Sequence, residues 1–127
     1  MHPNVSMLTR YYDALARGDV SAMLAVCGDP MTFQVPGRSR LAGKYDRSSL
    51  GALIGTLRAL GDGTFKAEVH DITATDAHGM ALMTCTVTRK GAQHEYRTVH
   101  VWRIQGGRPV AWYEYPRDLY QFDAIWS

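Results

Sequence analysis

Cysteine is scarce in this chain, and long apolar runs are absent. Only Cys27 and Cys85 of the 127 residues are cysteine, and their separation fits neither a metal site nor a redox pair. No segment approaches the roughly 20 consecutive apolar residues of a membrane helix. Charges at Arg10, Asp13 and Arg17 lie where a secretory signal would need an apolar run. We therefore expect two buried thiols, no membrane association and a cytoplasmic location.

Sequence signals for bound metals, nucleotides and nucleic acids are also missing. The stretch 37–43 lacks the pattern of a phosphate-binding loop, and no dinucleotide fingerprint occurs. The net charge is only +2, and Lys and Arg are scattered rather than gathered in the basic stripe that a phosphate backbone requires. Four histidines lack two-ligand metal spacing: His2, His70, His78 and His94. We expect no metal, no cofactor and no nucleic-acid partner.

The composition predicts a single domain, residues 1–127, and its first half is mainly helical. Hydrophobic residues make up 46% and charged residues 20%, which is typical of a globular domain with its own core. Three segments show helical spacing of apolar residues: Asn4–Ala16, a short helix capped by Asp19, and a helix capped by Asp46 or Ser48. One strand, Met31–Val35, separates the second helix from the third.

From Thr64 onward the apolar residues alternate with the period of two that is typical of strands. Four long strands follow in a meander: Thr64–Thr75, Met80–Lys90, Gln93–Gln105 and Pro109–Tyr115. The stretch 37–44 is predicted to be a loop with a little extended structure, and 118–126 one or two helical turns that pack Phe122 and Trp126 on the sheet. The predicted class is α+β: a curved antiparallel sheet wrapped by three N-terminal helices, with a cavity between helices and sheet.

The last hairpin can place a histidine opposite a glutamate. A three-residue loop, Gly106–Arg108, would align three pairs on one face: Ile104 with Val110, Trp102 with Trp112, and His100 with Glu114. A two-residue loop, Gly106–Gly107, would shift every partner by one and put Tyr113 opposite His100. We prefer the three-residue loop because it pairs aliphatic with aliphatic and aromatic with aromatic side chains, which stabilises a hairpin.

An imidazole beside a carboxylate in an apolar cavity is suited to general acid/base chemistry. Burial disfavours the charged carboxylate and a nearby imidazolium favours it, so such a pair can exchange protons efficiently near neutral pH. Glu114 would act as the base if its side chain points inward. The competing interpretation makes His100 a hydrogen-bonded sheet histidine and Glu114 a solvated strand residue.

Four segments carry a family resemblance: Arg10–Asp19, Val35–Gly37, Leu41–Gly43 and Val99–Gly107. Together with the order of elements, they resemble the nuclear transport factor two-like superfamily, which includes ketosteroid isomerase, limonene epoxide hydrolase and the SnoaL-like polyketide cyclases. The resemblance covers nearly the whole chain and implies a cone-shaped fold around a cavity. It does not specify a reaction, because this superfamily hosts many activities.

The resemblance to SnoaL-like cyclases implies catalytic roles for the hairpin pair. Those proteins have a strand histidine and, one hairpin later, an acidic residue that acts as general acid/base, an Asp where this chain has Glu114. Compared with ketosteroid isomerase, Tyr11 matches the oxyanion-hole tyrosine and His100 the protonated aspartate, but Val35 replaces the base. The steroid-isomerase mechanism therefore lacks its base here. The Arg and two Asp of limonene epoxide hydrolase have no clean counterpart, although Asp118 can reach the pocket mouth.

We expect a cofactor-independent enzyme that cyclises, isomerises or hydrates an apolar polyketide- or terpenoid-like substrate. Glu114 would remove a proton beside a carbonyl, while His100 and the hydroxyl of Tyr11 or Tyr12 hydrogen-bond the enolate. Asp118 either joins these catalytic residues or caps the last helix. Six residues are predicted to line the substrate site: Tyr12, Met23, Phe33, Val35, Trp102 and Trp112.

The alternative function is a non-catalytic domain of the same fold that binds a small molecule or mediates assembly. The outer face of the sheet carries Val99 and Val101, flanked by Glu95, Arg97 and Arg103. Such a face is apolar enough at its centre to bury against a second copy. We therefore expect a homodimer.

Overall fold

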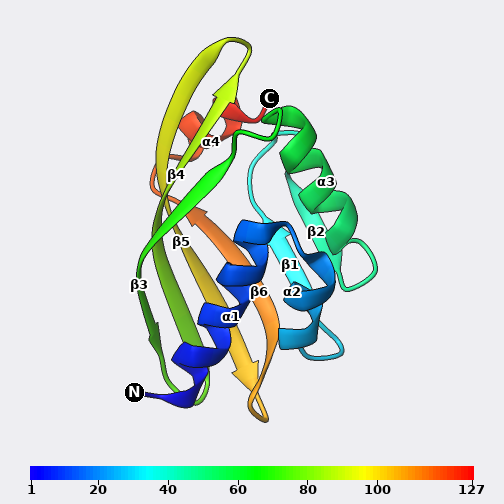
Figure 1. Ribbon diagram of the computed structural model, residues 1–127, viewed down its shortest axis with the longest axis vertical. Coiled ribbons are helices and arrows are strands. Elements are labelled where there is room, and N and C mark those ends of the chain that lie inside the picture. Colours follow the sequence, from blue (N-terminus) through cyan, green and yellow to red (C-terminus); the bar gives the residue numbers. More distant parts are fainter.

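The computed structural model describes residues 1–127 as an α+β fold in which an open six-stranded sheet is accompanied by four helices (Figure 1). The helices are α1 (Pro3–Arg17), α2 (Val20–Val26), α3 (Leu50–Leu60) and α4 (Leu119–Ile125). The strands are β1 (Thr32–Val35), β2 (Gly43–Asp46), β3 (Lys66–Ala74), β4 (His78–Arg89), β5 (Ala92–Gln105) and β6 (Arg108–Pro116). None of the helices combines the length and the apolarity needed to cross a membrane.

The sheet is mixed, and the prediction of a purely antiparallel sheet is wrong. Its strand order is β2–β1–β6–β5–β4–β3. β1 runs parallel to β6, with Phe33 opposite Trp112, and every other pair is antiparallel. The parallel pair arises because the chain leaves β1 through β2 and α3, builds the meander and comes back alongside β1 in the same direction. β2 replaces part of the predicted loop; it has no buried residue, so hydrophobic alternation does not reveal it.

Two helices, rather than three, precede the sheet, because α3 follows β1 and β2. Asp19 caps α2 as predicted, by accepting a hydrogen bond from the backbone N–H of Ala22. The predicted caps of α3 are wrong: its N-cap is Ser49, which makes no side-chain capping bond. Asp46 instead accepts hydrogen bonds from the backbone N–H groups of Ser48 and Ser49 in the preceding turn.

The core lies between the helices and the sheet. Figure 1 shows α1 and α3 on the same side of the curved sheet. A single cluster of 26 buried residues fills this space. Phe122 and Trp126 belong to it, which confirms that the C-terminal segment packs its aromatic residues on the sheet.

Buried Arg89 ties three chain segments together at one end of the sheet. Its guanidinium donates hydrogen bonds to the backbone oxygens of Leu60, Ile125 and Ser127. The oxygens of Leu60 and Ile125 lie at the C-terminal ends of α3 and α4, where helix carbonyls lack partners within the helix, and Ser127 follows α4. The Arg89 guanidinium therefore links the C-terminal ends of both helices to β4 through hydrogen bonds.

The β5–β6 hairpin achieves the predicted pairing through a different turn. Trp102 lies opposite Trp112 and His100 opposite Glu114, which confirms both pairs. The loop has two residues, not three: Gly106 and Gly107 have φ values of 59° and 77°, as a two-residue hairpin turn requires. Ile104 therefore pairs with Pro109, and the predicted pair with Val110 is wrong. Val110 is an extra, bulged residue that restores the register.

Candidate active site

A small apolar cavity lies between the helices and the concave face of the sheet. Its volume is about 50 Å³, and 16 of its 18 lining residues are hydrophobic. His100 and Glu114 are the two exceptions. No three His, Cys, Asp or Glu side chains gather into a group that could bind a metal ion. The cavity thus holds one carboxylate and one imidazole in apolar surroundings.

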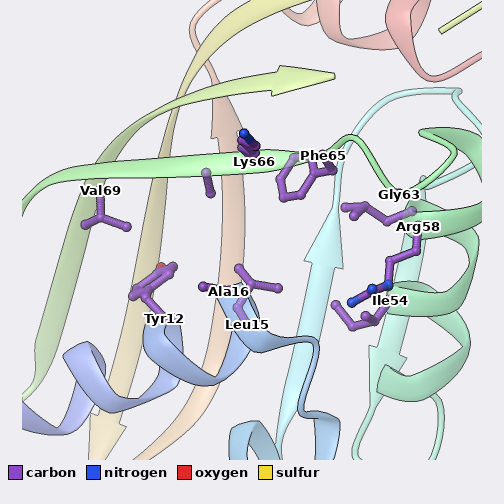
Figure 2. A pocket seen from close by; sticks show the side chains of 11 residues that line it. Tyr12, Leu15, Ala16, Ile54, Arg58, Gly63, Phe65, Lys66 and Val69 are labelled. Carbon is purple, nitrogen blue, oxygen red and sulfur yellow. The ribbon is translucent and has the colours of Figure 1, made fainter. Parts of the chain in front are cut away.

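A larger groove of about 340 Å³ adjoins this cavity. Figure 2 shows Tyr12, Leu15 and Ala16 of α1 on one side of it, Ile54 and Arg58 of α3 on another, and Phe65 and Val69 beside β3. Groove and cavity share five apolar wall residues: Leu15, Ile54, Leu57, Phe65 and Ala67. The groove and the cavity therefore lie next to each other along these residues.

Four hydrogen bonds connect α1 to the hairpin pair. The Tyr12 hydroxyl lies 2.8 Å from Nδ1 of His100, and Nε2 of His100 lies 3.1 Å from Oε2 of Glu114. The indole N–H of Trp102 donates to the Tyr12 oxygen at 3.0 Å, and the Thr98 hydroxyl donates to Oε2 of Glu114 at 2.5 Å. The side chains of His100 and Glu114 are only 8% and 10% exposed. Glu114 is therefore inside the fold, as a catalytic role requires.

The proton positions in this network follow from Tyr12. Burial raises the pKa of the Tyr12 hydroxyl far above its ordinary value, so it keeps its proton. Its oxygen accepts from Trp102, and the arrangement that gives its proton an acceptor is the one in which it donates to Nδ1 of His100. A neutral His100 then carries its proton on Nε2 and donates to the Glu114 carboxylate. Oε1 of Glu114 makes no hydrogen bond within the chain and is available to a bound molecule.

Tyr11 presents a free hydroxyl to the cavity. It is buried and lines the cavity, but its hydroxyl makes no hydrogen bond within the chain. Burial, followed by the nearby Tyr12, Cys27 and Glu114, raises the pKa of Tyr11 well above its ordinary value, so it is a donor. The hydroxyl of Tyr12 already has two partners within the chain, Trp102 and His100. Of the two tyrosines, Tyr11 is therefore the one free to bind an oxygen of a ligand.

The remaining predicted site residues divide between cavity and core. Phe33, Val35 and Trp112 line the cavity, and Tyr12 lines the groove. Two predicted wall residues are fully buried and line neither space: Met23 and Trp102. Asp118 is exposed, away from the cavity, and caps α4 by accepting from the backbone N–H of Gln121. Met23 and Asp118 thus lie outside the candidate site, whereas Trp102 supports the hairpin pair only through its hydrogen bond to Tyr12.

Sequence reasoning missed two residues on β5. Thr98 binds the carboxylate of Glu114, and Tyr96 lines the cavity. Both precede His100 by an even number of positions, so strand alternation places them on its face of the sheet. That signal was available in the sequence. Leu57 of α3 and Phe65, which precedes β3, also line the cavity. Their positions depend on how α3 and the segment after it pack, and no local sequence pattern predicts that packing.

Comparison with known proteins identifies the family. Residues 8–112 match the SnoaL-like domain. The uncharacterized protein Rv0034 of Mycobacterium tuberculosis is 28% identical over 127 residues, which cover 98% of this chain and 96% of that protein. The structure of Bal32a, from a soil-derived mobile gene cassette, superposes with a TM-score of 0.90 at 27% identity and covers 98% of this chain and 96% of its own.

A third structure shares the fold at lower identity. IdmH, a candidate polyketide cyclase from Streptomyces antibioticus, superposes with a TM-score of 0.76 at 17% identity and covers 95% of this chain and 99% of its own. Because the family match spans most of the residues and the structural match nearly all of them, the resemblance noted in the sequence is confirmed. The chain belongs to the SnoaL-like family and has the fold of solved proteins described as nuclear transport factor two-like.

Proposed function

We propose that this protein is a SnoaL-like enzyme in which Glu114 is the general base for cyclisation, isomerisation or hydration of an apolar, carbonyl-bearing substrate. The observation that supports this most is a single buried carboxylate, oriented by His100 and Thr98, in a cavity with otherwise apolar walls. Apolar surroundings strengthen the interaction of a carboxylate with a substrate proton. The fold shared with IdmH, a candidate polyketide cyclase, supports a polyketide-like substrate.

The proposed step is removal of a proton beside a carbonyl. Oε1 of Glu114 takes the proton, and the electrons of the broken C–H bond form an enolate. The Tyr11 hydroxyl donates a hydrogen bond to the enolate oxygen, which stabilises the developing charge. His100 and Thr98 hold the carboxylate through Oε2 and leave Oε1 free. The enolate then takes the proton back at another carbon, or attacks a second carbonyl to close a ring.

The sizes of the two spaces indicate how a substrate would lie. A cavity of about 50 Å³ is far smaller than the roughly 300–1,000 Å³ of typical ligand sites. The adjoining groove, at about 340 Å³, reaches that range. We therefore place the reacting carbonyl in the cavity and most of the apolar skeleton in the groove, against Leu15, Ile54 and Phe65.

Deuterium exchange tests the role of Glu114 without knowledge of the natural substrate. The flat bicyclic ketone 2-tetralone has acidic protons beside its carbonyl, and NMR follows their exchange in D₂O. We expect the wild-type protein to accelerate exchange and Glu114→Gln to reduce that acceleration at least about 100-fold, with binding of the ketone largely retained. His100→Ala is expected to weaken both exchange and binding.

Glu95→Gln is the matched control, because Glu95 is an exposed carboxylate on the neighbouring strand β5. It should exchange like the wild type. An unchanged rate in Glu114→Gln would remove Glu114 from the mechanism. A wild-type protein that binds 2-tetralone without accelerating exchange would favour the alternative, a non-catalytic ligand-binding domain. Mass spectrometry of small molecules that co-purify with the protein would then identify what the cavity holds.

We also propose that two chains pair through the outer face of the sheet. Two rows of apolar side chains cross this face: Met80, Val101 and Tyr113, and beside them Leu82, Val99 and Tyr115. Met80, Leu82 and Tyr115 are 47%, 45% and 56% exposed, which is unusual for residues so large and apolar. Leu82→Glu should convert a dimer into monomers in sedimentation velocity, whereas Leu119→Glu, elsewhere on the surface, should not. A monomeric wild type would contradict the proposal.

A further inference from the structure

The groove beside the cavity has one cation directed into it, the guanidinium of Arg58. Eight of the 11 residues that line the groove are hydrophobic, and none is Asp or Glu. Figure 2 shows the Arg58 side chain leaving α3 and reaching toward Leu15 and Ala16 at the end of α1. Lys66 also borders the groove, but it alternates on β3 with Ala67, so its side chain points to the other face of the sheet. The groove therefore combines apolar walls with one inward positive charge.

The guanidinium of Arg58 is held in position and has no partner. It lies directly against Gly18, where even a Cβ would collide with Nη1 of Arg58. Gly18 ends α1 with a φ of 67°, a left-handed conformation that favours glycine. Buried Arg89 donates to three backbone oxygens, but Arg58 forms no hydrogen bond or ion pair within the chain. Its N–H groups are therefore available to a bound molecule.

We infer that Arg58 binds a carboxylate of the substrate, so that the protein acts on an apolar molecule that carries an acid group as well as the reacting carbonyl. This inference rests on the proposed function, which places the reacting carbonyl at Glu114 and the skeleton in the groove. A guanidinium offers paired N–H donors that match the two oxygens of a carboxylate. Arg58 is then a specificity residue that contacts the substrate away from the reacting carbon.

The charges of the two spaces would also orient such a substrate. Glu114 is the one acidic residue that lines the cavity, and Arg58 is the inward cation of the groove. A substrate carboxylate is attracted by Arg58 and repelled by Glu114, so the acid end stays in the groove while the carbonyl end enters the cavity. The reverse orientation would bury two carboxylates together in apolar surroundings, which is strongly unfavourable. A neutral substrate lacks this preference for one orientation.

Binding of rigid, matched probes tests the inference. The probes are the 6- and 7-carboxylates of 2-tetralone and the corresponding carboxamides, which have nearly the same shape without the charge. Isothermal titration calorimetry near neutral pH gives each dissociation constant. We expect at least one carboxylate to bind the wild-type protein about fivefold or more tightly than its carboxamide, with an advantage that shrinks as salt is added.

The variants of Arg58 separate its charge from its shape. In Arg58→Gln the advantage of the carboxylate should fall below about twofold, while the carboxamide binds as before. Arg58→Lys keeps the charge but loses the paired donors, so it should retain part of the advantage. Arg103→Gln is the matched control, because it removes the same charge from an exposed position on the outer face of the sheet and should leave the preference unchanged.

Two results would overturn the inference. One is a wild type that binds none of the probes, or binds neither carboxylate more tightly than its carboxamide. The other is an Arg58→Gln protein that weakens carboxylate and carboxamide alike, because Arg58 would then only support the walls of the groove. Binding requires no turnover, so a carboxylate preference combined with unchanged deuterium exchange in Glu114→Gln would reject the proposed base and keep the inferred ligand class.

Discussion

Removing the hydroxyl of Tyr12 should disturb the candidate site more than any other loss of a single oxygen atom. In Tyr12→Phe the ring can keep its place, but two buried partners lose their hydrogen bonds. The indole N–H of Trp102 loses its acceptor, and Nδ1 of His100 loses its donor. Trp102 is fully buried and His100 is 6% exposed, so water cannot easily replace the missing oxygen.

The expected cost follows from these two orphaned groups. Each buried polar group left without a partner costs about 1–3 kcal/mol, so Tyr12→Phe should lower the free energy of unfolding by about 2–6 kcal/mol. Domains of this size are stable by about 5–15 kcal/mol, so the variant should still fold in most of that range. His100 also loses the donor that keeps its proton on Nε2. The neutral ring is then free to carry its proton on Nδ1, and in that tautomer it no longer donates a hydrogen bond to Glu114.

Urea unfolding followed by circular dichroism measures the stability loss, with Tyr115→Phe as the exposed control that should change it by less than about 0.5 kcal/mol. ¹⁵N NMR of the histidine ring reports the tautomer. A loss below about 1 kcal/mol in Tyr12→Phe would refute the proposed network. So would a wild-type His100 that carries its proton on Nδ1 near neutral pH.

Three further predictions concern stability. Burial raises the pKa of the Cys85 thiol to about 12. Because the unfolded chain loses this proton from about pH 9, the free energy of unfolding should fall between pH 9 and pH 12 by up to about 1.4 kcal/mol per pH unit. Cys85→Ala should make this alkaline decline, measured by urea unfolding, shallower. Arg89→Met leaves three backbone oxygens without their donor and should cost at least about 2 kcal/mol, with faster amide exchange in α4; unchanged exchange there would contradict the role of Arg89. Asp118→Ala should cost about 1 kcal/mol through the lost cap of α4 and leave the exchange of 2-tetralone unchanged, and a large loss of that activity would return Asp118 to the catalytic group.

Local patterns predicted most of the fold. The helices and the four long strands repeat apolar residues with periods close to those of helix and strand over many positions. β2 has only four residues and no buried side chain, so no period could show it. The parallel pairing of β1 with β6 joins strands about 80 residues apart in sequence, and nothing local in either strand specifies a parallel neighbour.

The candidate site was predictable only in part, for a similar reason. His100 and Glu114 belong to one hairpin, so matching side-chain types across its strands was enough to pair them, although the two-residue loop and the bulge at Val110 were not predicted. The tie between Tyr12 and His100 joins residues 88 positions apart and depends on where α1 crosses the sheet. Hydrophobicity likewise indicates that Met23 and Trp102 are buried, but it does not show which buried side chains border an empty space.

The bulge at Val110 determines which way the carboxylate faces. If Val110 were present but paired regularly after the same two-glycine turn, Tyr113 would lie opposite His100 and Glu114 would point to solvent. Deleting Val110 should leave His100 opposite Glu114, because the residues beyond it keep their partners. The bulge therefore compensates for the one extra residue between the turn and Ala111, and the direction of the carboxylate depends on that compensation.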